Sequence, residues 1–186
     1  MNAPESNVFD CALVFEGGGY RVSYTCAFAN VLLEQGIYFD YVCGLSAGAS
    51  TTVNYLSRDT KRVREAFMTD GVAKGLVGLP SLLRGNGYFD ADALYEGALR
   101  DGTLEFDWNS FAANPARLRI QAFERDSGRT VRFGREDMAD AMRMIDLVRA
   151  SSTLPGMMKP LEVDGRVLLD GGLGGHSCVH GGGRRL

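Results

Sequence analysis

An apolar strand that runs straight into a Gly-x-Ser-x-Gly turn is the feature that most constrains the fold of this chain. The segment Tyr41-Val42-Cys43 leads into Gly44-Leu45-Ser46-Ala47-Gly48. Glycines on both sides of such a turn allow a sharp passage from strand to helix, which lifts the serine hydroxyl clear of the backbone. The motif therefore predicts a strand over residues 41–43, a helix over residues 47–56, and an exposed serine between them.

A similar strand, glycine turn and helix precede this motif. Residues 11–15 form a continuous apolar run that ends at Gly17-Gly18-Gly19, as in a strand buried on both faces. A helix over residues 23–35, capped by Gly36, is predicted to bury one apolar stripe, made of Tyr24, Phe28, Val31 and Leu32. The repeated unit predicts an α/β fold, a three-layer sandwich whose central, mostly parallel sheet has helices on both faces.

The rest of the chain continues this alternation. Strands are predicted over residues 118–122, 130–133, 161–163 and 166–169, with Asp164-Gly165 as a hairpin turn and Asp170 directly after the last strand. Helices are predicted over residues 62–69, from Asp90 or Asp92 to residue 99, and over residues 136–150. The inner face of this last helix is expected to carry Met138, Ala141, Met142, Ile145 and Val148.

A glycine-rich stretch over residues 71–87 predicts a long loop with brief helical turns. Its apolar part, residues 76–83, fits three descriptions: a lid, a patch that meets lipid, and a buried loop. Of the three, the buried loop is favoured.

Composition excludes several classes of function. The chain has 186 residues, 45% of them hydrophobic and 23% charged, which is typical of one globular domain. Its net charge of −3, with scattered Lys and Arg, offers no basic surface to nucleic acid. There is neither a transmembrane run nor an N-terminal secretory signal, so we expect a cytoplasmic protein that meets membranes at most peripherally. Four cysteines lack metal or redox spacing and are expected to be free thiols: Cys11, Cys26, Cys43 and Cys178.

Three segments are expected to meet at one edge of the sheet, because each follows a predicted strand. They are Gly17-Gly18-Gly19 with Arg21, the Ser46 turn, and Asp170-Gly171-Gly172. Acyl transfer needs a nucleophile, a base, and hydrogen-bond donors for a developing oxyanion. The amides of a glycine run at a helix N-terminus suit the last role. A phosphate-binding loop and a plain turn remain alternatives for the glycine run, although neither of the common nucleotide-binding glycine motifs is matched.

Together these motifs resemble the patatin-like phospholipase family. The likeness rests on Glu16-Gly17-Gly18-Gly19-Tyr20-Arg21, Gly44-Leu45-Ser46-Ala47-Gly48 and Asp170-Gly171-Gly172, with Ala150-Ser151-Ser152-Thr153-Leu154-Pro155 in support. It covers about residues 11–175. In one position the chain departs from the family, which usually has glycine where Val22 stands.

The resemblance implies a serine hydrolase of acyl lipids, of the phospholipase A or esterase type, that acts on an acyl lipid or phospholipid without metal or cofactor. It implies Ser46 as nucleophile, Asp170 as base, and the amides of Gly17, Gly18 and Gly19 as oxyanion hole. For Arg21 two roles are expected, steering of an anion and support of the loop.

Other hypotheses differ in the base or in the absence of catalysis. An α/β-hydrolase triad would take His176 or His180 as base, but the five residues between Asp170 and His176 leave no room for another strand. A catalytically impaired fragment could bind lipid or protein through an exposed apolar face. Residues 1–175 are expected to be the hydrolase core, incomplete at its C-terminal end relative to the family. Residues 176–186 lack apolar periodicity and are expected to be a disordered or out-of-frame tail.

Overall fold

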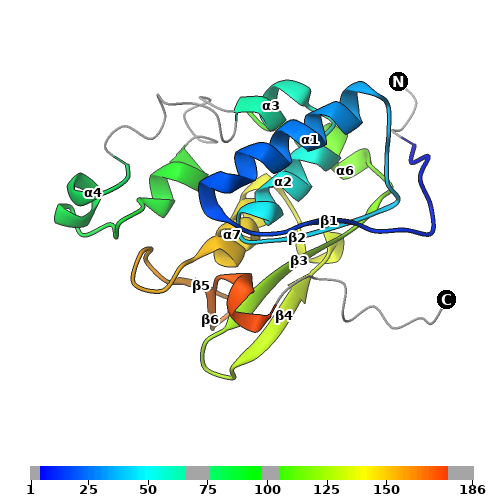
Figure 1. Ribbon diagram of the computed structural model, residues 1–186. Helices are drawn as coiled ribbons and strands as arrows, with labels where there is room; N and C mark the ends of the chain where they lie inside the picture. The colour runs from blue at the N-terminus through cyan, green and yellow to red at the C-terminus, as the bar shows by residue number, and fades with distance from the viewer. Residues whose placement is uncertain (1–4, 66–75, 98–104, 176–186) are drawn as a thin grey trace.

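The computed structural model describes residues 5–65, 76–97 and 105–175, which form one mixed sheet packed against helices (Figure 1). The strands are β1 (Leu13–Phe15), β2 (Tyr41–Leu45), β3 (Arg117–Glu124), β4 (Arg129–Phe133), β5 (Leu161–Val163) and β6 (Arg166–Leu169). The α-helices are α1 (Val22–Glu34), α2 (Ala47–Leu56), α3 (Thr60–Glu65), α4 (Leu79–Leu83), α6 (Trp108–Ala113) and α7 (Ala141–Ser152). The shorter elements are the 3-10 turns η1 (Gly19–Arg21), η3 (Arg135–Asp137) and η4 (Gly171–Gly174), and the π-helical segment η2 (Asp92–Gly97).

The strands follow the order β1-β2-β3-β6-β5, and β4 pairs with β3 outside this path. β1, β2 and β3 run parallel, as the repeated strand and helix pattern predicts. The other pairings are antiparallel, and tight turns connect β3 to β4 and β5 to β6. At the predicted turn between β5 and β6, Asp164 and Gly165 both have positive φ angles, of 52° and 72°. The predicted α/β fold is therefore confirmed, with antiparallel strands added to a parallel half.

The pairing of β3 brings the ends of two distant strands together. β2 ends opposite Gln121 of β3, and β6 ends opposite Phe123. β2 and β6 lie along the same edge of β3, because β4 pairs with Gln121 and Phe123 along the other edge. β2 and β6 run in opposite directions along this edge. The residues that directly follow them, Ser46 and Asp170, consequently converge.

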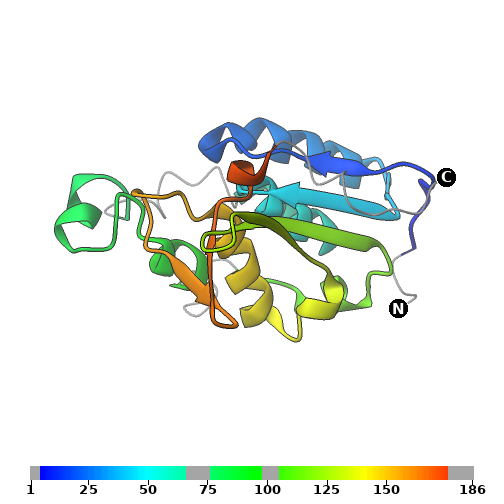
Figure 2. The ribbon, with the colours of Figure 1, turned by 90° about the horizontal axis from the view of Figure 1, so that it is seen from below.

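The helices are arranged in layers over the sheet (Figures 1 and 2). α2 and α7 pack against the strands, and α1 and α3 pack against α2. The core between these layers is apolar, and its largest fully buried members include Phe15, Tyr55, Leu118 and Ile120. Alternate residues of β3 point into this core, as the predicted strand pattern requires. One core thus holds β1, β2, β3 and α2, the elements that present Ser46.

Helix α1 forms where it is predicted but buries a different face. Three of the four side chains expected to be buried are more than half exposed: Tyr24, Phe28 and Val31. The buried face carries Leu32 together with small residues such as Cys26 and Ala29. Cys26 Sγ lies 3.4 Å from Thr51 Oγ1 of α2, so small side chains permit the close approach of the two helices. The predicted stripe is wrong, because α1 packs against α2 through the face with small side chains, and its aromatic face is exposed to solvent.

Capping residues explain two further differences. The helix expected from residue 136 begins at residue 141, because the Asp140 side chain accepts a hydrogen bond from the Arg143 amide. Within this helix, α7, Met142 is only half-buried. Helix α6 was not predicted at all. Its signal in the sequence is Asp107, whose side chain accepts a hydrogen bond from the Ser110 amide at 2.9 Å.

Two loop segments also differ from expectation. The favoured description of residues 76–83 as a buried loop is wrong, because this segment contains the short helix α4 and its leucines are exposed: Leu79, Leu82 and Leu83. Cys11 is exposed and lies before β1, which is shorter than predicted. Cys11, Cys26 and Cys43 are free thiols, as expected. Cys178 and residues 66–69 of a predicted helix lie outside the described residues.

In the described part of the chain, no helix combines the length and the apolar character needed to cross a membrane.

The orientation of α1 can be tested by paired substitutions. Leu33, which is 6% exposed, lies on the buried face of α1, and Leu33→Ala should lower the free energy of unfolding by about 2–5 kcal/mol through the cavity that it leaves. Phe28→Ala on the exposed face should change it by less than about 0.5 kcal/mol. Urea denaturation followed by circular dichroism measures both values. Equal losses in the two variants would contradict this orientation.

Candidate active site

Ser46 occupies a strained turn between β2 and α2. Its φ and ψ angles are 54° and −134°, in a region that costs a residue with a side chain about 1–3 kcal/mol. The residues after the turn pack closely against the end of β1, because a Cβ at Gly48 would lie 2.6 Å from the Glu16 carbonyl oxygen and still nearer to that of Phe15. The Ser46 amide donates a hydrogen bond to Ser151 Oγ at 2.8 Å. The surrounding structure therefore holds the serine in a conformation that it would not adopt by itself.

Asp170 meets Ser46 across 124 positions of sequence. The Ser46 hydroxyl donates a hydrogen bond to Asp170 Oδ2 at 2.6 Å. The other carboxylate oxygen, Oδ1, accepts from the Gly172 amide at 2.8 Å, and the Asp170 amide donates to the Thr153 carbonyl at 2.8 Å. Both side chains are largely buried, Ser46 being 9% and Asp170 5% exposed, so the serine is less exposed than its motif predicts. The two residues predicted as nucleophile and base are thus in direct contact.

Two supporting residues were missed by the sequence reasoning. Ser151 Oγ accepts from the Ser46 amide and donates to the Gln121 carbonyl at 2.6 Å. The Gln121 side chain donates to the carbonyls of Gly171 and Gly175, at 3.0 and 3.2 Å. Gln121 of β3 is thereby linked to both sides of the site. The three successive hydroxyl residues at positions 151–153 were the available signal for Ser151, whereas Gln121 follows the ordinary alternation of a strand.

Burial controls the basicity of Asp170. Loss of solvent raises the pKa of the Asp170 carboxyl above its ordinary value, and hydrogen bonds from Ser46 and Gly172 act in the opposite direction. Removal from water disfavours the charged form of a carboxyl group. A carboxylate with a raised pKa accepts a proton more readily than an exposed one.

The glycine loop runs directly beside the serine. A Cβ at Gly17 would lie 2.8 Å from Ser46 Cβ and 3.4 Å from Ser46 Oγ. Gly18 and Gly19 have positive φ angles, of 152° and 56°. Among the described residues, no hydrogen bond occupies the amides of these three glycines. Arg21 Nε donates to the Gly18 carbonyl at 3.4 Å, a contact that supports the loop. The loop can therefore offer N–H donors close to Ser46.

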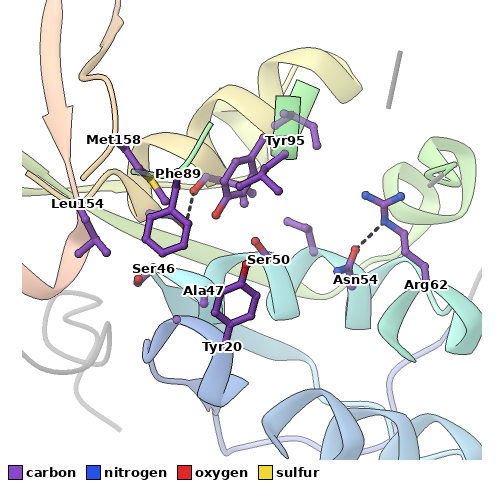
Figure 3. A pocket seen from close by; sticks show the side chains of 16 residues that line it. Tyr20, Ser46, Ala47, Ser50, Asn54, Arg62, Phe89, Tyr95, Leu154 and Met158 are labelled. Carbon is purple, nitrogen blue, oxygen red and sulfur yellow. Dashed lines mark hydrogen bonds between the residues drawn. The ribbon is translucent and has the colours of Figure 1, made fainter. Parts of the chain in front are cut away.

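A cavity of about 190 Å³ opens beside Ser46 (Figure 3). Most of its lining is apolar and comes from α2, η2, α7 and neighbouring loops: Val53, Phe89, Leu94, Ile145, Val148, Leu154 and Met158. At the end away from Ser46, Arg62 Nε donates a hydrogen bond to Asn54 Oδ1 at 2.8 Å. Such a lining suits a hydrocarbon chain that extends from the serine.

Polar groups within this cavity are few. The Tyr95 hydroxyl lies on the side of the cavity that faces Ser50 (Figure 3). Burial raises the pKa of Tyr95, so its hydroxyl stays neutral and can donate. Burial also lowers the pKa of Arg62 to about 10, which leaves this side chain charged at neutral pH.

Within the described residues, no group of three or more His, Cys, Asp or Glu side chains could hold a metal ion. His176 and His180, the bases of the alternative triad, lie outside those residues.

Comparison with known proteins identifies the family. Residues 13–176 match the family model of the patatin-like phospholipases. Among solved structures, VipD from Legionella pneumophila is similar, with a TM-score of 0.55 and 15% identity over 87% of this chain and 45% of that chain. This likeness concerns the fold, and the chain spans less than half the length of VipD. No curated protein sequence matches significantly. Because the family model covers most of the chain, this protein belongs to the patatin-like phospholipase family.

Proposed function

We propose that this chain hydrolyses ester bonds of acyl lipids, as a phospholipase A or esterase, with Ser46 as nucleophile and Asp170 as base. The observation that carries the proposal is the 2.6 Å hydrogen bond from Ser46 Oγ to Asp170 Oδ2. The glycine amides and the apolar cavity beside Ser46 support it, because they supply the donors and the acyl site that the reaction needs. Membership of the patatin-like family supports lipid as the substrate class.

The first half of the reaction forms an acyl-enzyme. Asp170 Oδ2 accepts the Ser46 proton while Ser46 Oγ attacks the ester carbonyl carbon. The carbonyl oxygen becomes negative and takes hydrogen bonds from amides of Gly17, Gly18 and Gly19. When the tetrahedral intermediate collapses, the ester C–O bond breaks and the leaving alcohol takes the proton held by Asp170.

The second half releases the acid. Asp170 accepts a proton from water, and the resulting hydroxide attacks the carbonyl carbon of the acyl-enzyme. Collapse breaks the bond to Ser46 Oγ, which recovers its proton from Asp170. The same carboxylate serves both halves, so the scheme needs no histidine.

The apolar cavity is the proposed site of the acyl chain. It begins at Ser46 and ends at the hydrogen-bonded pair of Asn54 and Arg62 (Figure 3). A chain long enough to reach this pair would meet polar groups that are already bonded to each other. We therefore propose that this end limits the length of acyl chain accepted.

Labelling with a fluorophosphonate probe tests the nucleophile. The wild-type chain should react with one equivalent of probe and hydrolyse a soluble short-chain ester. Ser46→Ala should abolish labelling and lower kcat/KM by at least about 10³-fold, because the attacking oxygen is lost. The exposed Ser127, whose hydroxyl bonds to Glu124, provides a matched serine control, and Ser127→Ala should leave both readouts unchanged.

Labelling that persists in Ser46→Ala would refute the assignment. Lipid binding by a wild-type chain that is not labelled would favour the second candidate, a non-catalytic lipid- or protein-binding module. The exposed aromatic residues of α1 are the observation that favours this second candidate, since Tyr24 is 82% and Phe28 55% exposed.

The pH dependence of hydrolysis tests the base. Only ionised Asp170 can accept the Ser46 proton, so kcat/KM for an uncharged ester should rise with pH through the pKa of this carboxyl. Because burial raises that pKa, the midpoint of the acid limb should lie above 3.8, the ordinary value for aspartate. Initial rates in overlapping buffers measure the midpoint, and circular dichroism at each pH checks that the protein stays folded. A midpoint at or below the ordinary value would contradict Asp170 as base.

The same burial makes Asp170 costly for stability. With a raised pKa, the folded state binds the Asp170 proton more tightly than the unfolded chain does, so stability from this group is lost as pH rises through the folded pKa. Asp170→Asn should therefore raise the free energy of unfolding at neutral pH, by about 1 kcal/mol, while it removes activity. Thermal denaturation at neutral and acid pH measures the difference, which should shrink in acid. A lower melting temperature for Asp170→Asn at neutral pH would contradict this account.

A further inference from the structure

Residues 76–90 form an arm that projects from the body of the protein, with α4 at its tip (Figures 1 and 2). Its two sides pair through an antiparallel bridge between Val77 and Phe89. The Gly78 amide donates to the Tyr88 carbonyl at 2.7 Å, and the Asp90 amide to the Leu76 carbonyl at 2.8 Å. These bonds make the arm an ordered extension of the fold.

The base of the arm forms one wall of the active-site cavity. Phe89 and Met158 both line the cavity, and Gly87 forms a bridge with Met158. The Phe89 amide donates to the Met157 carbonyl at 3.0 Å. The Phe89 ring also lies 6.3 Å from the ring of Tyr20, which lines the cavity from the opposite side in Figure 3. Whatever the arm contacts is therefore brought next to the cavity that contains Ser46.

The tip of the arm exposes apolar side chains in an arrangement set by α4. Ser81 faces inward and is fully buried, whereas Leu79, Leu82 and Leu83 are 63%, 50% and 79% exposed. Tyr88, lower on the arm, is 43% exposed. An exposed cluster of this kind marks a surface that meets an apolar partner.

The exposed charges beside these leucines are basic. The arm contains one carboxylate, Asp90, which is 6% exposed and accepts a hydrogen bond from Asn86 Nδ2 at 2.7 Å, so it contributes little to the surface. The Arg84 side chain of the arm and the Lys159 side chain of the neighbouring segment 154–161 are exposed, and Lys159 Nζ lies 3.0 Å from Asn86 Oδ1, which places this cation against the arm. The whole chain carries a net charge of −3, so this positive surface stands apart from the overall balance. Leucines flanked by basic residues are suited to a bilayer with anionic headgroups.

We propose that the arm is a docking surface for an anionic lipid bilayer. Leu79, Leu82 and Leu83 enter the boundary between headgroups and acyl chains, and Arg84 and Lys159 contact lipid phosphates. If the proposed function holds, docking at this point delivers lipid to the cavity through Phe89 and Met158. The docking itself does not require catalysis.

Vesicle sedimentation with the full chain tests the docking surface. The Ser46→Ala background prevents hydrolysis from altering the vesicles, which consist of phosphatidylcholine with or without phosphatidylglycerol. We expect binding to the anionic vesicles to exceed binding to the neutral ones. The pair Arg84→Gln and Lys159→Gln should weaken the anionic binding by about 30-fold, since two basic residues near the surface are lost. The pair Leu79→Ser and Leu83→Ser should weaken binding to both kinds of vesicle by at least about tenfold.

Matched controls separate the arm from general changes in hydrophobicity and charge. Phe9→Ser removes an exposed apolar side chain from the segment before β1, and Arg132→Gln removes an exposed cation from β4. Both should bind vesicles as the Ser46→Ala parent does, and melting temperatures check that every variant is folded. Failure of the parent to bind anionic vesicles, or equal losses in arm and control variants, would overturn the proposal. Probe labelling of the wild-type chain decides the proposed function separately, so the failure of one proposal is distinguishable from failure of the other.

Discussion

The shared edge of β3 is the constraint on which the site depends. β2 and β6 reach this edge from opposite directions and end at neighbouring positions, so the next residue after each strand meets the other. Both strands are held by backbone ladders, and the Ser46 to Asp170 hydrogen bond is therefore positioned by the sheet. Gln121 lies at this point of β3, where its carbonyl and side chain connect to Ser151 and Gly171. Displacement of β6 along β3 would separate the two groups without changing either.

The arrangement places two unfavourable features next to each other. Ser46 has strained backbone angles, and Asp170 is a carboxyl group largely removed from water. Each costs free energy that a sequence selected for stability alone would avoid. The buried core of β1, β2, β3 and α2 offsets these costs, and glycine at position 48 removes the collision with β1 that any side chain would cause. Strain and burial concentrated at one hydrogen-bonded pair accord with the proposed catalytic role.

Particular residues show where sequence reasoning succeeded and where it failed. The bounds of α2 were predicted correctly, because the glycine turn that precedes this helix is a local signal and does not depend on which segments pack against it. The buried face of α1 was predicted wrongly, since the spacing of large apolar residues indicates the face with Tyr24 and Phe28, whereas the buried face carries small residues such as Cys26 and Ala29. The contact between Cys26 and Thr51 favours the smaller face, and it depends on a partner helix that the pattern of α1 does not contain. The leucines of α4 were placed inside for the same reason, because apolar character alone does not reveal whether a neighbour covers it.

Local chemistry in the sequence alone determined the parallel half of the sheet, the serine turn, the hairpin that ends in Asp170, and the family to which these motifs point. Such features depend on neighbouring residues, whose steric and hydrogen-bonding preferences act within a few positions. Only the tertiary structure decided which face of α1 is buried, that Gln121 and Ser151 support the site, and that the arm exposes its leucines beside the cavity. These depend on contacts between segments far apart in the chain, where shape and competing partners outweigh local preference.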